Sequence, residues 1–146
     1  MSPRLLGISH LGLSVPDLTV ADFFIEVLGF ESISDDSDLR FVVHRNARIA
    51  IGFSTHGGSV TGDFDEHNPG LDHLALAVSD VSTLADWDSE LRRRGVDTSN
   101  VVESPAGHHL NFRAPENLPI ELYVINDAMA EAVGLSVEDA YAGSHT

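Results

Sequence analysis

Residues 8–17, ISHLGLSVPD, return 63 positions later in a related form as residues 71–80, LDHLALAVSD. In both copies large apolar residues alternate with small or polar ones, which is typical of a half-buried strand, and an Asp stands where a helix can begin. A repeat of this kind outweighs any local assignment. The sequence therefore predicts two copies of one unit, with His10 and His73 at matching positions of the first strand.

The residues after each repeated strand predict one helix and three further strands. In the first copy the helix is expected over 19–28, and the strands over 30–34, 39–44 and 48–54. In the second copy the helix is expected over 82–94, and the strands over 96–102, 108–113 and 119–125. The chain is thus predicted to be an α+β protein of two tandem βαβββ modules.

The composition limits the partners of the chain. Its 146 residues include 23 acidic and 8 basic side chains, for a formal charge of −15, which repels nucleic acid and anionic membrane surfaces. It has neither a long apolar segment nor a basic-then-apolar leader, so we expect a cytoplasmic protein without a membrane span. Because there is no cysteine, only His, Asp and Glu remain as strong metal ligands.

Strand alternation places both histidines on the sheet face opposite the helices. The other residues expected on this face of the strands near the histidines are small: Gly12, Ser14, Ala50, Gly52, Ala75 and Ala77. On the last strand, alternation gives Glu121 the same face. Because small residues cannot fill the space over a sheet, we expect a concave pocket with His10, His73 and Glu121 on its wall.

Two imidazoles and one carboxylate on one wall suit one divalent metal per site, Fe, Mn, Zn or Ni, with up to three positions left open. The competing interpretation makes each histidine a hydrogen-bonded core residue and Glu121 an exposed strand acid. The matched pair of histidines in a chain without cysteine favours the metal.

The strand over 108–113 supplies further candidates on the pocket face. His109 would act in catalysis beside Glu121, as a general base or as a donor to a bound oxyanion, and Arg113 would pair with a substrate carboxylate. Asn111 and Tyr123 are further substrate-binding candidates. For each of these, an ordinary packing or rim role is the alternative. Four other histidines, at strand ends, in the linker and in the tail, are expected to be exposed to solvent: His44, His56, His67 and His145.

These motifs resemble the vicinal oxygen chelate superfamily, which includes glyoxalase I, extradiol dioxygenases, methylmalonyl-CoA epimerase, fosfomycin-resistance thiol transferases and bleomycin-binding proteins. The resemblance rests on SHLGLSV, DHLALAV, VLGFE and GHHLNFRAPENLPIELYV. It implies a glyoxalase-like fold, in which the two modules form a cupped, mostly antiparallel eight-stranded sheet. His10, His73 and Glu121 are then the metal ligands, contributed by one chain or shared between the two chains of a homodimer.

The resemblance also sets the domain boundaries. A single domain is expected over 6–126, built from module 1 over about 6–54 and module 2 over about 71–126, with a linker over 55–70. A C-terminal tail over 127–146 is expected to form a short helix at 128–133 and then to fray.

The activity implied is that of a metal-dependent enzyme of glyoxalase or dioxygenase type, which chelates two neighbouring oxygens of a small-molecule substrate. The reaction would be that of a lyase, an isomerase or an extradiol-type ring-cleaving oxygenase. Ala50 stands where glyoxalase I and the epimerase have a fourth ligand, and Gly12 where the fosfomycin transferases have a hydroxyl residue, which weakens both comparisons. The alternative is a small-molecule or antibiotic-binding or resistance protein of the same fold, without catalysis.

Overall fold

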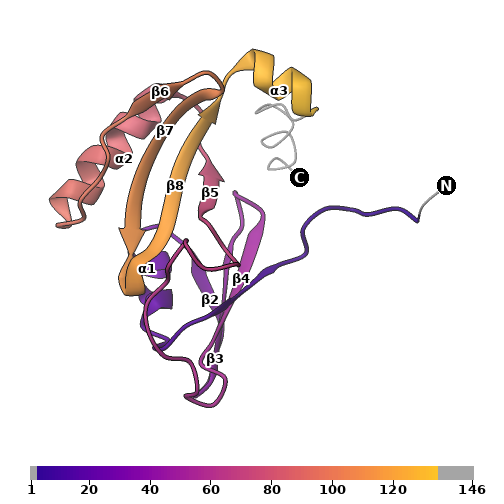
Figure 1. Cartoon of the computed structure of the whole chain (residues 1–146), viewed down its shortest axis with the longest axis vertical. Helices are drawn as coiled ribbons and strands as arrows, with labels where there is room; N and C mark the ends of the chain where they lie inside the picture. The colour runs from indigo at the N-terminus through magenta and orange to yellow at the C-terminus, as the bar shows by residue number, and fades with distance from the viewer. Residues whose placement is uncertain (1–2, 135–146) are drawn as a thin grey trace. The chain divides into compact units, whose positions relative to one another are not determined.

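The computed structural model describes residues 3–134, and the chain divides into two units, Met1–Gly62 and Asp63–Thr146 (Figure 1). We call them the first unit and the second unit and describe each by itself. Among residues 3–134, none of the helices has the length and apolar character needed to cross a membrane.

The first unit is a βαβββ module. Its elements are β1 (Leu11–Ser14), α1 (Val20–Glu26), β2 (Glu31–Asp35), β3 (Leu39–His44) and β4 (Ile49–Ser54). The strand order in its sheet is β1-β4-β3-β2, with β1 parallel to β4 and the other two pairs antiparallel. This order pairs the first strand of the module with its last.

Aromatic packing joins α1 to one face of this sheet. Phe24 of α1 is fully buried, and its ring lies edge-on to Phe30 and Phe53, with centroids 5.4 and 5.1 Å away. Burying a side chain of this size contributes about 1.5–3 kcal/mol. Leu13 and Ile51 are buried as well, as the alternation in the sequence predicts.

The second unit repeats the module and adds a short helix. Its elements are β5 (Leu74–Ala77), α2 (Val81–Arg93), β6 (Val102–Ser104), β7 (Gly107–Ala114), a 3-10 turn (Pro115–Asn117), β8 (Leu118–Ile125) and α3 (Asp127–Val133). The strand order is β5-β8-β7-β6, with β5 parallel to β8 and the other pairs antiparallel.

Helix α2 begins and ends at residues suited to these positions. The Asp80 carboxylate accepts a hydrogen bond from the Thr83 amide at 2.7 Å, which satisfies a free N–H of the first turn. Gly95, at φ +79°, follows the helix in the left-handed conformation that glycine adopts without strain. Leu84 and Leu91 are fully buried, and α2 runs along one face of the sheet (Figure 1).

The structure confirms the α+β fold of two βαβββ modules, with one four-stranded sheet in each. The strand expected over 96–102 is wrong: β6 lies at Val102–Ser104, and only Thr98 of the earlier stretch forms an isolated bridge, to Phe112. Asn100, at φ +61°, interrupts the extended conformation. The expected fraying of the tail after residue 134 lies outside the described residues.

The histidines of the repeat were expected inside strands, but each lies one residue before its strand. The strands begin at Leu11 and Leu74, after His10 and His73. In the second unit the cause is visible in the register, where Leu74 faces Ile120 of β8. Pro119 comes just before and has no N–H to continue the ladder beyond Leu74.

Candidate functional site

The face of the second sheet opposite α2 carries two cross-strand rows of side chains. The strand register puts three residues opposite one another in each row: Ala75, Glu121 and Asn111 in the first, and Ala77, Tyr123 and His109 in the second. Directly opposite residues on one face of a sheet are close enough for their side chains to touch. The alanines leave space beside the polar members of each row.

His73 lies beside the first row with both ring nitrogens near carboxylates. Its Nδ1 is 2.6 Å from Asp72 Oδ2, and its Nε2 is 3.7 Å from Glu121 Oε1. Glu121 is the more enclosed partner, with 14% of its side chain exposed, whereas Asp72 extends into solvent. The sequence separates Asp72 and Glu121 by 49 positions, yet both converge on one imidazole.

The contact with Asp72 orients the imidazole. An ionised carboxylate only accepts hydrogen bonds, so Nδ1 of a neutral His73 carries the proton and Nε2 presents a lone pair toward Glu121. Two acceptors that face each other repel unless a cation lies between them. An imidazole held by a carboxylate through one nitrogen and free at the other is also the usual arrangement of a metal-ligating histidine.

This donor set fits a divalent metal. Two ligands that are each about 2.1 Å from one ion lie about 3.0–3.6 Å apart at angles of about 90–120°. The separation of 3.7 Å between the donor atoms of His73 and Glu121 is close to this range. Within the second unit as described, no third His, Asp or Glu completes the pair into a compact group of three donors.

The second row contains an imidazole with an unsatisfied nitrogen. The rings of His109 and Tyr123 stack with centroids 5.9 Å apart and planes 14° apart. Nδ1 of His109 is buried and has no hydrogen-bond partner among the described residues. The Tyr123 hydroxyl lies 3.3 Å from the Ser104 hydroxyl. Stacking therefore fixes the His109 ring, while hydrogen bonding does not.

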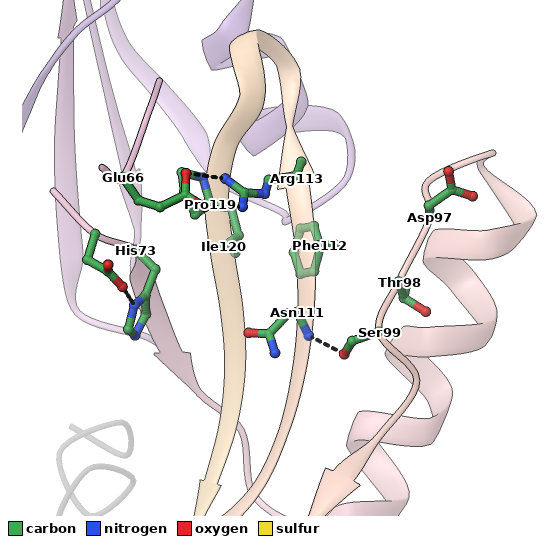
Figure 2. Close-up of a pocket in the computed structure, with 11 residues that line it drawn as sticks. Glu66, His73, Asp97, Thr98, Ser99, Asn111, Phe112, Arg113, Pro119 and Ile120 are labelled. Atoms are coloured by element: carbon green, nitrogen blue, oxygen red, sulfur yellow. Dashed lines mark hydrogen bonds and ion pairs between the residues drawn. The ribbon is translucent and has the colours of Figure 1, made fainter. Parts of the chain in front are cut away.

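A hollow of about 360 Å³ extends from His73 over this end of the sheet (Figure 2). The following residues line it: Glu66, Asp72, His73, Asp97, Thr98, Ser99, Asn111, Phe112, Arg113, Pro119 and Ile120. Three of the six sequence-predicted site residues in the second unit, His73, Asn111 and Arg113, are among them. The hollow therefore adjoins His73, the member of the His73–Glu121 pair that is among its lining residues.

Arg113 is not free to meet a ligand. Its Nη2 and Nη1 donate to the two carboxylate oxygens of Glu66 at 2.6 and 3.1 Å (Figure 2). This hydrogen-bonded contact holds the pKa of Glu66 down at about 2. Sequence reasoning missed Glu66 because it lies in a segment without hydrophobic periodicity, where no local pattern indicates its partner.

The first unit contains His10, which is exposed. Its Nδ1 is 3.1 Å from the Ser9 hydroxyl, and its ring lies edge-on to Phe41 with centroids 6.0 Å apart. Phe41 also lies over Gly52, where an added Cβ would come within 3.2 Å of its ring. Part of the space that the small residues were expected to leave open is thus filled by Phe41.

The histidines expected in solvent differ in their surroundings. His56 is exposed, but its Nε2 is 3.0 Å from the hydroxyl of Ser14 on β1. His44 is half-buried, because its ring packs on Phe30 and its Nδ1 accepts from the Ala47 amide. His67 is exposed, and His145 lies outside the described residues.

Comparisons with known proteins identify the fold. No protein-family model and no curated protein matches the sequence. Among solved structures, the chain is similar to the glyoxylase/bleomycin resistance protein/dioxygenase domain from Frankia sp. EAN1pec. The two share 26% identity over 89% of this chain and 99% of that one, with a TM-score of 0.73.

Two other solved structures share the fold at lower identity. Lactoylglutathione lyase from Agrobacterium tumefaciens is 18% identical over 83% of this chain and 95% of that one, with a TM-score of 0.67. The fosfomycin resistance protein FosX from Listeria monocytogenes is 18% identical over 86% of this chain and 98% of that one, with a TM-score of 0.66.

The paired βαβββ modules and these structural neighbours define a protein of the glyoxalase-like fold class. The similarity to the glyoxylase/bleomycin resistance protein/dioxygenase domain agrees with the resemblance to the vicinal oxygen chelate superfamily that the repeated histidine motifs implied.

Proposed function

We propose that the chain is a metal-dependent enzyme that acts on a small molecule with two neighbouring oxygens. His73 and Glu121 of the second unit would hold one divalent ion, Fe, Mn, Zn or Ni, and the role of His10 as a further ligand stays a prediction from the sequence. The observation that carries the proposal is the separation of 3.7 Å between His73 Nε2 and the Glu121 carboxylate, with the Asp72 carboxylate 2.6 Å from the other ring nitrogen. Such a pair is stabilised by a cation between the two acceptors.

The residues around the proposed metal would have different roles in the reaction. A bound divalent metal supplies Lewis-acid stabilisation of negative charge on the substrate oxygens. Asp72 keeps His73 in the tautomer that leaves Nε2 free, and Glu121 adds a negative charge with little exposure to water. His109, whose ring is fixed by Tyr123, would accept or donate a proton, and Asn111 lies directly across from Glu121 to orient the substrate.

The reaction classes proposed are those of a lyase, an isomerase or an extradiol-type dioxygenase. The names of the neighbours support this range, because they include a lactoylglutathione lyase and a domain described as glyoxylase/bleomycin resistance protein/dioxygenase. Ala50 has no side-chain donor atom, so we do not propose a further metal ligand at this position.

A second candidate is a small-molecule or antibiotic-binding protein without catalysis. It is favoured by the hollow beside His73 and by the finding that, among the described residues, no third donor joins His73 and Glu121 in a compact group. Binding without chemistry needs the hollow but not the ion.

Metal content separates the two candidates. Protein purified without chelators or a nickel column is analysed by elemental mass spectrometry, beside His73→Ala and Glu121→Ala. We expect about one divalent ion per site in the parent and a loss of most of it in both variants. His108→Ala is the matched control, because His108 is the neighbour of His109 on β7 and alternation turns it to the other face.

The results have distinct meanings. Stoichiometric metal retained in both site variants would overturn the ligand assignment. A parent protein that takes up no metal after incubation with Fe, Mn, Zn or Ni would leave the binding protein as the supported candidate. His109→Gln tests the proton-transfer role separately, since it should retain the metal of the parent and lose turnover.

A further inference from the structure

The carboxylate that meets Arg113 comes from the chain itself. Glu66 lies in the segment before β5, and its two oxygens accept from both terminal nitrogens of the guanidinium at 2.6 and 3.1 Å. This two-point geometry is the one by which arginine binds a carboxylate ligand. Figure 2 shows Arg113 reaching from β7 past Pro119 of β8 to Glu66 at the edge of the hollow.

The segment that carries Glu66 is fastened to the second unit independently of the ion pair. The Phe64 amide donates to the Glu116 carbonyl at 2.8 Å, and the Asn117 side-chain amide donates to the Phe64 carbonyl at 2.9 Å. Arg113 Nη1 also contacts the Asn117 carbonyl at 3.3 Å. The backbone at Phe64, two residues before Glu66, is therefore positioned by hydrogen bonds that do not involve the Glu66 carboxylate.

The carboxylates around the hollow balance the positive charge of the Arg113 guanidinium. Glu66 and Asp72 both act on the Arg113 guanidinium and raise its pKa, with the Glu66 hydrogen bonds as the largest cause. Since the pKa of Glu66 is about 2, its carboxylate is ionised at every pH near neutrality. Asp97 adds a third carboxylate to the wall. An anionic ligand would meet three carboxylates and one cation that is already paired.

We propose that Glu66 determines the charge class of the substrate, by occupying Arg113 in place of a substrate carboxylate. The hollow then takes a neutral or cationic molecule with neighbouring oxygens and rejects an anionic one. This inference rests on the proposed function and replaces the simpler expectation that Arg113 pairs with a substrate carboxylate.

Three catechols whose short substituents end in a neutral, a cationic or an anionic group test the inference. They are 4-ethylcatechol, which is neutral, 3,4-dihydroxyphenethylamine, which is cationic, and 3,4-dihydroxyphenylacetate, which is anionic. Their dissociation constants are measured by calorimetry on Zn-loaded protein without oxygen, at low ionic strength. For the parent we expect the anionic probe to bind about fivefold more weakly than the neutral one. The carboxylates of the hollow repel the anion, and solvent screening of these partly exposed charges limits the difference in affinity.

The variant Glu66→Gln keeps the size of the side chain and leaves the Phe64 bonds in place. We expect it to tighten the anionic probe by roughly fivefold to tenfold, because Arg113 becomes available, and to weaken the cationic probe. In the double variant Glu66→Gln/Arg113→Gln this gain for the anion should disappear. Glu103→Gln is the control, because it removes one negative charge from exposed β6 outside the hollow.

Equal binding of the three probes by the parent, or unchanged discrimination in Glu66→Gln, would overturn the inference. Failure of all three probes to bind would overturn it as well, since the hollow would then accept no molecule of this class. Metal analysis of the same samples separates this failure from that of the proposed function. Metal bound without charge discrimination refutes only the role of Glu66, whereas discrimination without any metal uptake refutes only the metal-dependent function.

Discussion

His67 is an exposed imidazole whose pKa is raised, with Asp65 as the largest cause. Its Nδ1 is 2.8 Å from Asp65 Oδ1, and its pKa is raised, first by this hydrogen bond and then by the charge of Asp65. Because the folded pKa exceeds the unfolded value of about 6.5, the contact stabilises the chain fully below that pH. The stabilisation is lost as the pH rises through the folded pKa.

We predict that Asp65→Asn lowers the pKa of His67 toward its ordinary value. The measurement is a titration followed by the ring proton signals of His67 in NMR spectra. The control Asp63→Asn removes one negative charge two residues earlier and should change the pKa of His67 by a smaller amount. An unchanged His67 pKa in Asp65→Asn would show that the acidic surface as a whole, and not Asp65, sets it.

Gly107 at the start of β7 is required by its backbone and by its neighbour. Its φ is +149°, and an added Cβ would lie 1.9 Å from the Val124 carbonyl oxygen across the strand pair. Gly12, by contrast, has ordinary φ and open space around it. We predict that Gly107→Ala destabilises the fold by more than about 2 kcal/mol, while Gly12→Ala changes stability by less than about 1 kcal/mol.

Urea unfolding followed by far-UV circular dichroism measures this difference. Equal midpoints for the two glycine variants would contradict the close approach of Gly107 to β8.

At the scale of elements, the two helices of the repeat begin differently although both follow an Asp. Asp80 caps α2 through the Thr83 amide. Asp17 bonds the Thr19 amide at 2.9 Å, and α1 begins at Val20 without a side-chain cap. The repeat in the sequence predicted both starts but not this difference, because it depends on how the chain turns between Asp and helix.

We predict that Asp80→Ala lowers the melting temperature by roughly a few degrees, whereas Asp80→Asn retains most of the stability. The hydrogen bonds to Thr83 lower the pKa of Asp80, so its stabilising effect is present above the unfolded pKa and lost as the pH falls through the lower folded one. Asp86→Ala, at an exposed position within α2, is the control. A melting temperature for Asp80→Ala as high as that of the control would exclude a capping role.

Alternation predicted the faces of β7 and β8 but not the contacts made by loops. Period two is enough to place Glu121, Tyr123 and His109 on one face, because each strand residue can point only to one side or the other. The partner of Arg113 depends on the path of residues 63–68, for which no periodicity exists. Likewise, the ring of Phe41 over Gly52 is a cross-strand contact, and the register that creates it follows from turn geometry.

At the scale of the whole molecule, the N-terminal segment exposes apolar side chains that a solvated chain does not favour. Leu5, Leu6 and Ile8 are 93, 90 and 85% exposed. Burial of such residues against a second copy would remove this surface from water. We therefore expect the homodimer that the superfamily resemblance implies.

Size-exclusion chromatography with light scattering tests this expectation at micromolar concentration. The parent should elute with twice the mass of the chain, and the triple variant Leu5→Ser/Leu6→Ser/Ile8→Ser should shift toward the monomer. A monomeric parent would contradict the dimer, and an undisturbed dimer in the variant would assign the interface to other residues.

The strand orders β1-β4-β3-β2 and β5-β8-β7-β6 pair the first strand of each module with its last. No strand pair among the described residues therefore spans the boundary between Gly62 and Asp63. A chain cut at that peptide bond would keep every hydrogen-bonded strand ladder intact within one fragment or the other. Each histidine motif therefore lies in a segment that contains, within itself, the complete strand ladder of its own sheet.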